Sequence, residues 1–125
     1  MSYAPILLFT YNRLNHTKHC IESLQKNALA IESELFIYSD AAKTEDQEQA
    51  VKDVRLYLQS ITGFKKITII ERNKNWGLAS NIIDGVTTQV KMYGKVIVLE
   101  DDLIVAPHFL DFMNDALELY KDEPK

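Results

Sequence analysis

Short apolar runs alternate with amphipathic stretches along the chain, and this alternation constrains the fold more than any other feature. Residues 5–10 (PILLFT) and 95–99 (KVIVL) are nearly continuous in hydrophobicity, as strands covered on both faces are. Residues 34–39 (ELFIYS) and 66–71 (KITIIE) are also rich in β-formers. A helical pattern follows each run. This order predicts an α/β fold, a Rossmann-like and mostly parallel sheet with helices on both faces.

Capping residues set the expected limits of the first two helices. Asn15 is placed to cap a helix that runs to about Asn27. Thr44 and Gln47 have the spacing of a capping box at the start of the second helix, which Gly63 is suited to end.

The last two helices are predicted from their apolar spacing. The third is expected from Leu78 to about Gly94, with Leu78, Ile82, Val86 and Val90 on its buried stripe. Pro107 suits the first turn of the fourth helix. The buried face of that helix is expected to contain Phe109, Phe112, Met113, Ala116 and Tyr120.

Chain length, net charge and cysteine content exclude several classes of protein. A chain of 125 residues is one domain's worth. Its net charge of −4 argues against a nucleic-acid partner, which a basic face would favour. Cys20 is the single cysteine, so a disulfide within the chain and a cysteine-rich zinc site are excluded. No signal peptide or membrane-spanning run is evident, so we expect a cytoplasmic protein, with membrane association left open.

Polar loops follow all of the predicted strands. In open parallel sheets, ligands bind beyond the carboxyl ends of the strands. The loops at that edge are residues 11–13, 40–43, 73–77 and 100–102. Their convergence on one edge of the sheet predicts a binding site there.

The acidic triplet Glu100-Asp101-Asp102 is the sharpest feature of these loops. Adjacent carboxylates repel one another, and Mg²⁺ or Mn²⁺ binds carboxylate oxygens while keeping positions open for phosphate. Strand alternation places Glu100 and Asp102 on one side and Asp101 on the other. A solvated strand end is the alternative, and the triplet alone does not decide between them.

Other residues near this edge have two readings each. Arg13 is expected either to pair with a phosphate or to be solvated. Asp40 is expected either to accept a hydrogen bond from a base or ribose or to cap its loop. Gly77 opens a helix whose N-terminus attracts anions, although a lone glycine is more often a turn. For Trp76, packing under its loop is favoured over covering a ligand. We expect the histidines to be exposed and the cysteine to belong to the core, with no functional role for any of them: His16, His19, His108 and Cys20.

Taken together, these segments resemble the nucleotide-binding half of glycosyltransferases of the GT-A fold, which use sugar nucleotides. The likeness is carried by PILLFTYNR at 5–13, IYSDAAK at 37–43, ERNKNWGLASN at 71–81 and VIVLEDDLIVAPHFLDFM at 96–113. The last segment is most similar to the N-acetylglucosaminyltransferase I type, whose Glu-Asp-Asp triplet is a variant of the Asp-x-Asp motif. The resemblance implies that residues 1–125 form a nucleotide-sugar-binding half of a longer, truncated GT-A domain.

The resemblance also implies roles for single residues. Asp102 would bind Mn²⁺ or Mg²⁺ that bridges the diphosphate, and Asp40 would accept from the base, commonly uracil. Glu100 and Asp101 would contact the ribose and the donor sugar. The remaining donor-binding residues would be Thr10, Tyr11, Asn12, Arg13, Asn75, Gly77, Leu78 and Asn81.

These roles add up to hexosyl or N-acetylhexosaminyl transfer from a UDP-type sugar. The general base is expected beyond Lys125, the acceptor is an undetermined glycan, lipid or protein, and an exposed sheet edge is expected to favour self-association. The alternative is a non-catalytic nucleotide-sugar-binding or regulatory module. A nucleotidyltransferase ranks last, because residues 10–13 (TYNR) lack the glycine-rich loop it requires.

Overall fold

The computed structural model describes residues 2–120, which form one parallel sheet and its covering helices. The sheet order is β3-β2-β1-β4, and every neighbouring pair is parallel. The strands are β1 (Ile6–Thr10), β2 (Glu34–Ser39), β3 (Lys66–Glu71) and β4 (Ile97–Glu100). The helices are α1 (Leu14–Gln25), α2 (Glu48–Leu58), α3 (Leu78–Tyr93) and α4 (Phe109–Tyr120), with short 3₁₀ turns at Ala28–Glu32 (η1) and Glu45–Gln47 (η2).

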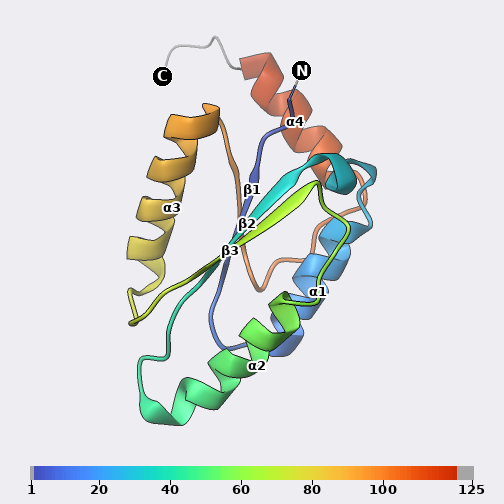
Figure 1. Cartoon of the computed structure of the whole chain (residues 1–125). Coiled ribbons are helices and arrows are strands. Elements are labelled where there is room, and N and C mark those ends of the chain that lie inside the picture. Colours follow the sequence, from blue (N-terminus) through green and yellow to red (C-terminus); the bar gives the residue numbers. More distant parts are fainter. Residues whose placement is uncertain (1, 121–125) are drawn as a thin grey trace.

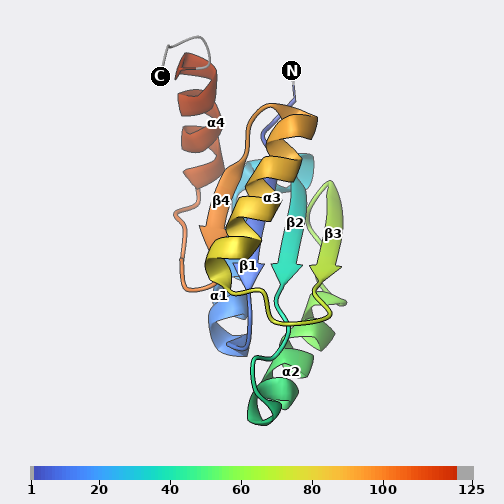
Figure 2. The same ribbon diagram turned by 90° about the vertical axis from the view of Figure 1, so that its left-hand side faces the viewer.

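Helices cover both faces of the sheet, which confirms the predicted fold class. Figure 1 shows α3 on one side of the sheet and α1, α2 and α4 on the other. In Figure 2 the strand arrows run in the same direction, with α3 in front of them. The carboxyl ends of all the strands therefore meet at one edge, as the sequence predicted.

Alternation along the strands divides the core into two clusters. Leu7 and Phe9 of β1 and Phe36 and Tyr38 of β2 face α3. The alternate residues of the strands face α1, α2 and α4. Together with residues of these helices they form the larger cluster, which includes Ile6, Leu8, Leu35, Ile37, Ile97, Leu99, Val54 and Leu110. Both faces of the central strands are thus buried, which explains their continuous hydrophobicity.

Neither predicted capping interaction forms, although Thr44 does precede the 3₁₀ turn η2. Arg13, not Asn15, precedes α1, and no side chain caps that helix. The Thr44–Gln47 box does not form, since Thr44 bonds to Asp46 and the Gln47 side chain accepts from a distant tyrosine. Residues 45–47 adopt a 3₁₀ turn instead, and α2 begins at Glu48.

The buried faces of α3 and α4 also differ from expectation. On α3 the buried positions are Asn81, Gly85 and Gln89. Of the predicted stripe, Ile82 and Val86 do pack against the sheet, whereas Leu78 and Val90 are exposed. Helix α4 begins at Phe109, after Pro107, and buries Leu110 and Asn114. Of the face predicted for α4, Phe109 and Met113 pack against the larger core cluster, whereas Phe112 and Tyr120 are exposed.

Buried side-chain amides explain how α4 is attached to the fold. Asn27 Oδ1 accepts from the Leu110 amide, and Asn114 Oδ1 accepts from the Ala4 amide. These hydrogen bonds fix the first turns of α4 against residues far away in the sequence, which no local pattern encodes.

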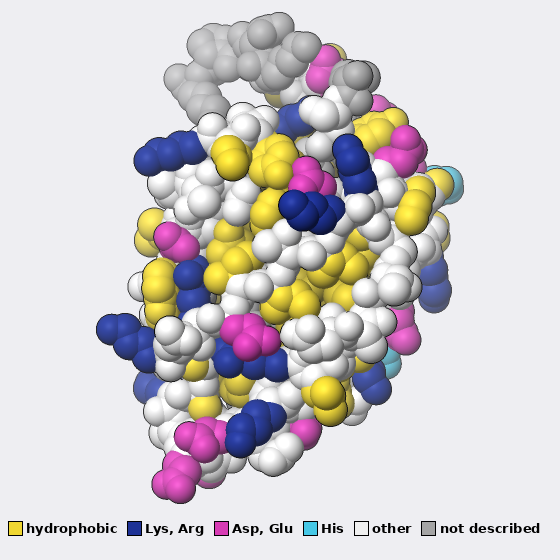
Figure 3. Space-filling view, in the orientation of Figure 1, with side chains coloured by type: hydrophobic (Ala, Val, Ile, Leu, Met, Phe, Trp, Pro, Cys, Tyr) yellow, Lys and Arg dark blue, Asp and Glu magenta, His cyan; other side chains and the backbone are white. Residues whose placement is uncertain are grey.

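Apolar and charged side chains separate on the surface. On the face shown in Figure 3, hydrophobic side chains gather in the middle and charged ones surround them. No helix within residues 2–120 combines the length and hydropathy needed to span a bilayer.

Candidate functional site

A pocket of about 240 Å³ lies at the carboxyl ends of β1 and β2, beneath the start of α3. It draws on the ends of the strands and on the loop before α3, so residues far apart in the sequence meet there. Its lining comprises Phe9, Thr10, Tyr11, Tyr38, Asp40, Lys43, Asn75, Gly77, Leu78 and Asn81.

One end of the pocket is aromatic. Phe9 and Tyr38 are paired in register on neighbouring strands, and their rings stack with centroids 5.0 Å apart. Gly85 of α3 lies directly above, because a Cβ there would come within 2.9 Å of the Phe9 ring. Gln89 donates to the Tyr38 hydroxyl. This end of the pocket is therefore flat, apolar and tightly held.

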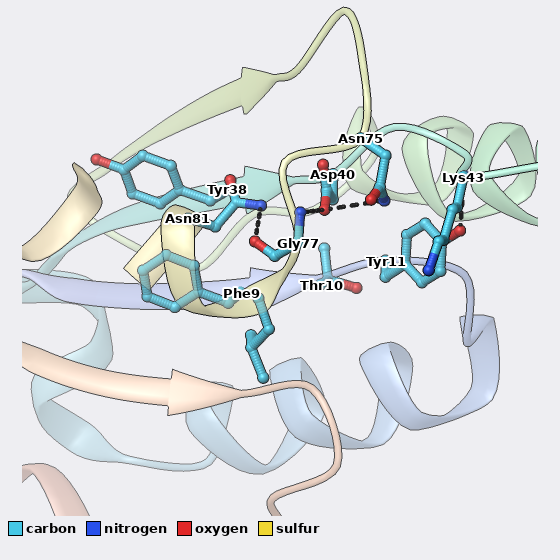
Figure 4. A pocket seen from close by; sticks show the side chains of 10 residues that line it. Phe9, Thr10, Tyr11, Tyr38, Asp40, Lys43, Asn75, Gly77 and Asn81 are labelled. Atoms are coloured by element: carbon cyan, nitrogen blue, oxygen red, sulfur yellow. Dashed lines mark hydrogen bonds between the residues drawn. The ribbon is translucent and has the colours of Figure 1, made fainter. Parts of the chain in front are cut away.

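The opposite end of the pocket is polar. Figure 4 shows Tyr11 and Lys43 there, away from the Phe9 and Tyr38 rings. The Tyr11 hydroxyl donates to Gln47 Oε1 and accepts from the Lys43 amide at 2.9 Å. Tyr11 thus ties the loop after β1 to the loop after β2, and the pocket acquires one lysine side chain at its rim.

Asp40 organises the middle of the pocket. Its buried carboxylate accepts four hydrogen bonds, from the amides of Ala41, Trp76 and Gly77 and from the Asn75 side chain. The three backbone bonds measure 2.9 Å each. A carboxylate has about four acceptor positions, so these donors from its own chain use its capacity. In this structure Asp40 holds the loop before α3.

Arg72 supports the same loop from below. Its guanidinium donates to Asn81 at 2.8 Å and pairs with Asp84 at 2.7 Å. It also stacks on Trp76, 3.7 Å from the ring centroid, and faces Tyr38 at 5.3 Å. The favoured packing role of Trp76 fits this contact.

The acidic triplet divides between the two faces of the sheet. Glu100 pairs with Phe9 in register, which places it on the face of the sheet that holds the pocket. Asp101 lies on the opposite face, where Arg13 donates to it at 2.7 Å. Glu100 and Asp102 are exposed, whereas Asp101 is buried. The opposite sides of Glu100 and Asp101 were predicted from strand alternation.

The carboxylates of Glu100 and Asp102 are the candidate ligands for a divalent cation such as Mg²⁺ or Mn²⁺. Within residues 2–120, no group of three or more His, Cys, Asp or Glu side chains is arranged to hold a metal ion. Glu100 and Asp102 form no ion pair among the described residues. Mg²⁺-type ions are commonly held by one or two carboxylates, with phosphate and water completing the shell. The exposed carboxylates fit that mode and do not form a closed protein cage.

Cys20 packs beneath the acidic triplet as a core residue. Burial, followed by the charges of Asp101 and Asp102, raises the pKa of its thiol to about 12. His16 and His19 on the same helix are exposed, and so is His108. These positions agree with the interpretation of exposed histidines and a core cysteine.

The pocket gathers most, but not all, of the expected residues. Asn12, Arg13, Glu100, Asp101 and Asp102 do not line it, although they follow β1 and β4 at the same edge. It also contains Phe9 and Tyr38, which were not expected, and Lys43, which lies in a predicted edge loop but was given no role. Strand alternation and register offered a signal for the two aromatic residues, because they share the α3 face. The support from Arg72 had no local signal.

A doubly covered parallel sheet with a pocket beyond its carboxyl ends defines a Rossmann-like ligand-binding domain. The sequence model of the family described as glycosyl transferase family 2 matches residues 6–121. The chain belongs to this family.

Solved structures support the same fold. The structure of S. aureus TarS aligns with a TM-score of 0.60 and 16% identity, over 97% of this chain and 20% of that chain. A TarS fragment, residues 1–349, gives 0.61 and 16% over 97% and 33%. The mannosyltransferase PcManGT from Pyrobaculum calidifontis, in complex with GDP-Man and Mn²⁺, gives 0.58 and 16% over 97% and 34%.

These matches confirm a glycosyltransferase GT-A fold. The chain spans between a fifth and about a third of the length of those chains. No curated protein matched the sequence significantly. The finer likeness to N-acetylglucosaminyltransferase I stays a prediction.

Proposed function

We propose that this chain is the donor-binding half of a metal-dependent glycosyltransferase that transfers a hexosyl or N-acetylhexosaminyl group from a UDP-type sugar. Family membership supports the class of reaction. The finer assignment rests on the site. One observation carries it: the pocket and the exposed carboxylates of Glu100 and Asp102 lie at the same edge of the sheet.

The pocket suits a nucleotide because its two ends differ. Phe9 and Tyr38 are buried and form the apolar wall of one end, whereas the half-buried ring of Tyr11 offers aromatic surface to a planar base. Lys43 at the rim and the start of α3 favour negative charge. The family resemblance assigns Asp40 to the base, but its four hydrogen bonds to its own chain support the role of holding the loop that shapes the pocket.

Asp102, with Glu100 beside it, would hold Mn²⁺ or Mg²⁺ together with the donor diphosphate. Such a metal neutralises the charge that develops on the departing diphosphate. PcManGT was solved with GDP-Man and Mn²⁺, which supports a sugar nucleotide and a divalent ion for a protein of this fold.

Titration calorimetry tests the proposal directly. UDP, a UDP-sugar and GDP are titrated into the chain with and without Mn²⁺. We expect UDP to bind more tightly with Mn²⁺, and Asp102→Ala to remove that enhancement. Asp115→Ala, an exposed aspartate of α4, is the matched control and should bind as the wild type does. Equal affinity in wild type and Asp102→Ala would contradict the role of Asp102.

A binding module without catalysis is the alternative, and the observation that favours it is the small number of acidic side chains in the pocket lining. Among the described residues Asp40 is the only acid in the lining, and its oxygens are already bonded. No free general base therefore lies in the pocket described here. Release of sugar from a UDP-sugar by this chain, measured with and without acceptor, separates a binding module from a transferase.

A further inference from the structure

Asp101 is the residue of the acidic triplet that faces away from the pocket. Its amide donates to the Phe9 carbonyl at 3.2 Å, which continues the pairing of β1 with β4. Its side chain is on the face of the sheet covered by α1, the face of Leu99. Only 5% of Asp101 is exposed to solvent. Neither Asp101 nor Arg13 lines the pocket, and Thr10 is the residue that the pocket shares with the hydrogen-bond network around Asp101.

The Asp101 carboxylate is held by residues of β1 and of the β1–α1 loop. Arg13 Nη2 donates to Oδ1 at 2.7 Å, and the Thr10 hydroxyl approaches Oδ2 at 3.5 Å. Thr10 in turn shares a hydrogen bond of 2.6 Å with Thr17 of α1. Thr17 also donates to the Arg13 carbonyl at 2.8 Å. The network joins the end of β1, the start of α1 and the turn after β4.

This network determines how the rest of the triplet is presented. The turn closes with a hydrogen bond of 3.2 Å from the Leu103 amide to the Glu100 carbonyl. With Asp101 paired on one face, Glu100 and Asp102 are left exposed. Pairing Asp101 with a cation also reduces the repulsion among three adjacent carboxylates.

We propose that the Arg13–Asp101 ion pair is a positioning device that fixes the turn carrying Glu100 and Asp102, without touching the donor. The proposal rests on the proposed function. It differs from the roles implied by family resemblance, in which Arg13 contacts the phosphates and Asp101 the sugar. Both side chains act through their neighbours.

A double-mutant cycle tests the pair. Affinity for UDP with Mn²⁺ is measured for Arg13→Gln, Asp101→Asn and the double variant. Loss of a residue that orients a metal ligand commonly costs 10–100-fold in metal affinity, so we expect each single variant to weaken binding about tenfold. The double variant should be no weaker than either single one, and Arg13→Lys should recover part of the affinity. Losses that multiply in the double variant would show separate contacts with the ligand and overturn the proposal.

Val54→Ala controls for a general loss of stability. Val54 is fully buried in the larger core cluster, and it is not part of the pocket lining. Its substitution should lower the melting temperature and leave the affinity for UDP with Mn²⁺ unchanged. If Arg13→Gln and Asp101→Asn also lower only the melting temperature, the pair is merely structural and the proposal is wrong.

Hydrogen exchange without ligand separates this proposal from the proposed function. The Leu103 amide should exchange faster in each single variant than in the wild type, because the turn is no longer fixed. If the wild type binds no UDP with Mn²⁺, the proposed function fails, and exchange at Leu103 alone then decides whether the pair positions the turn. Unchanged exchange at Leu103 would overturn the positioning role.

Discussion

Asp40 and Arg72, at the carboxyl edge of the sheet, form their hydrogen bonds with other residues of the chain. Asp40 is 6% exposed and bonds to four groups of its own chain. Arg72 contacts Asn81, Asp84 and two aromatic rings. Asp40, which the sequence analysis expected to contact a ligand, and Arg72, which it did not single out, thus both shape the pocket.

Asp40→Asn should destabilise the chain by about 1–3 kcal/mol, because the amide NH₂ would face backbone N–H donors and leave at least one of them unpaired. Urea denaturation measures the loss. The emission of Trp76, the single tryptophan, should change as its loop loosens. Asp115→Asn, on the exposed side of α4, should leave both measurements unchanged.

The Cys20 thiol should react slowly with a disulfide reagent in the folded chain. A pKa raised from 9.0 to about 12 lowers the thiolate fraction at pH 8 by a factor of about 1000. Absorbance of the released thiol gives the rate, in buffer and in urea. Equal rates in the two would show that the thiol is not buried.

The raised pKa of the Cys20 thiol also makes the free energy of unfolding depend on pH. The unfolded thiol loses its proton near pH 9, whereas the folded thiol keeps it to about pH 12. The free energy of unfolding should therefore fall as pH rises through this interval. Cys20→Ala should show a shallower fall, by the slope of one proton, and an unchanged slope would contradict the shift.

For helix α3, packing against the sheet determines which face is buried, and the spacing of apolar residues in the sequence does not. On the face of α3 over the sheet, Gly85 leaves room for the Phe9 and Tyr38 rings. The two polar residues of this face, Asn81 and Gln89, are buried with hydrogen bonds to Arg72 and to the Tyr38 hydroxyl. An apolar stripe centred one position away was predicted from spacing alone. The offset at Gly85 follows from the size of the Phe9 and Tyr38 rings.

Gly85→Ala should destabilise the fold by about 1–2 kcal/mol, although alanine is the better helix former by about 1 kcal/mol. The added Cβ would lie 2.9 Å from the Phe9 ring, which is itself stacked and buried. Chemical denaturation measures the change. Thr87→Ala, on the exposed side of α3, should be neutral or stabilising. A stabilised Gly85→Ala variant would show that the helix can move away without cost.

The elements were predictable to within a few residues, because strands buried on both faces carry a strong apolar signal. The expected 95–99 strand is observed as Ile97–Glu100. The Thr44–Gln47 cap failed for a tertiary reason, since Tyr11 bonds the Gln47 side chain from another loop. The Arg13–Asp101 pair joins residues 88 positions apart, and no local pattern indicates it. The site's location was thus predictable, but the partners of its side chains were not.

For the whole molecule, β4 matters because it lies at the end of the sheet order. Val98 of β4 is 38% exposed. Several large apolar side chains that follow in the chain are also exposed: Leu103, Ile104, Phe112 and Leu119. Unpaired edges with apolar neighbours tend to pair with other chains.

We expect the 125-residue chain to self-associate with increasing concentration, as the sequence suggested. Val98→Lys places a charge on the exposed side of β4 and should shift the equilibrium toward monomer. Sedimentation velocity over a hundredfold concentration range measures this. Glu100 is left intact, so binding of UDP with Mn²⁺ serves as a check that the variant is folded. A wild-type chain that remains monomeric throughout would refute the expectation.

The hydrogen bonds of Asp40 also set an order of events during synthesis and refolding. They connect the end of β2 with a loop more than thirty residues later, beyond β3. That loop acquires its anchors only once those strands are aligned side by side. Partly assembled chains should therefore lack the shaped pocket, and any affinity that depends on its shape should appear only after β2 and β3 have paired.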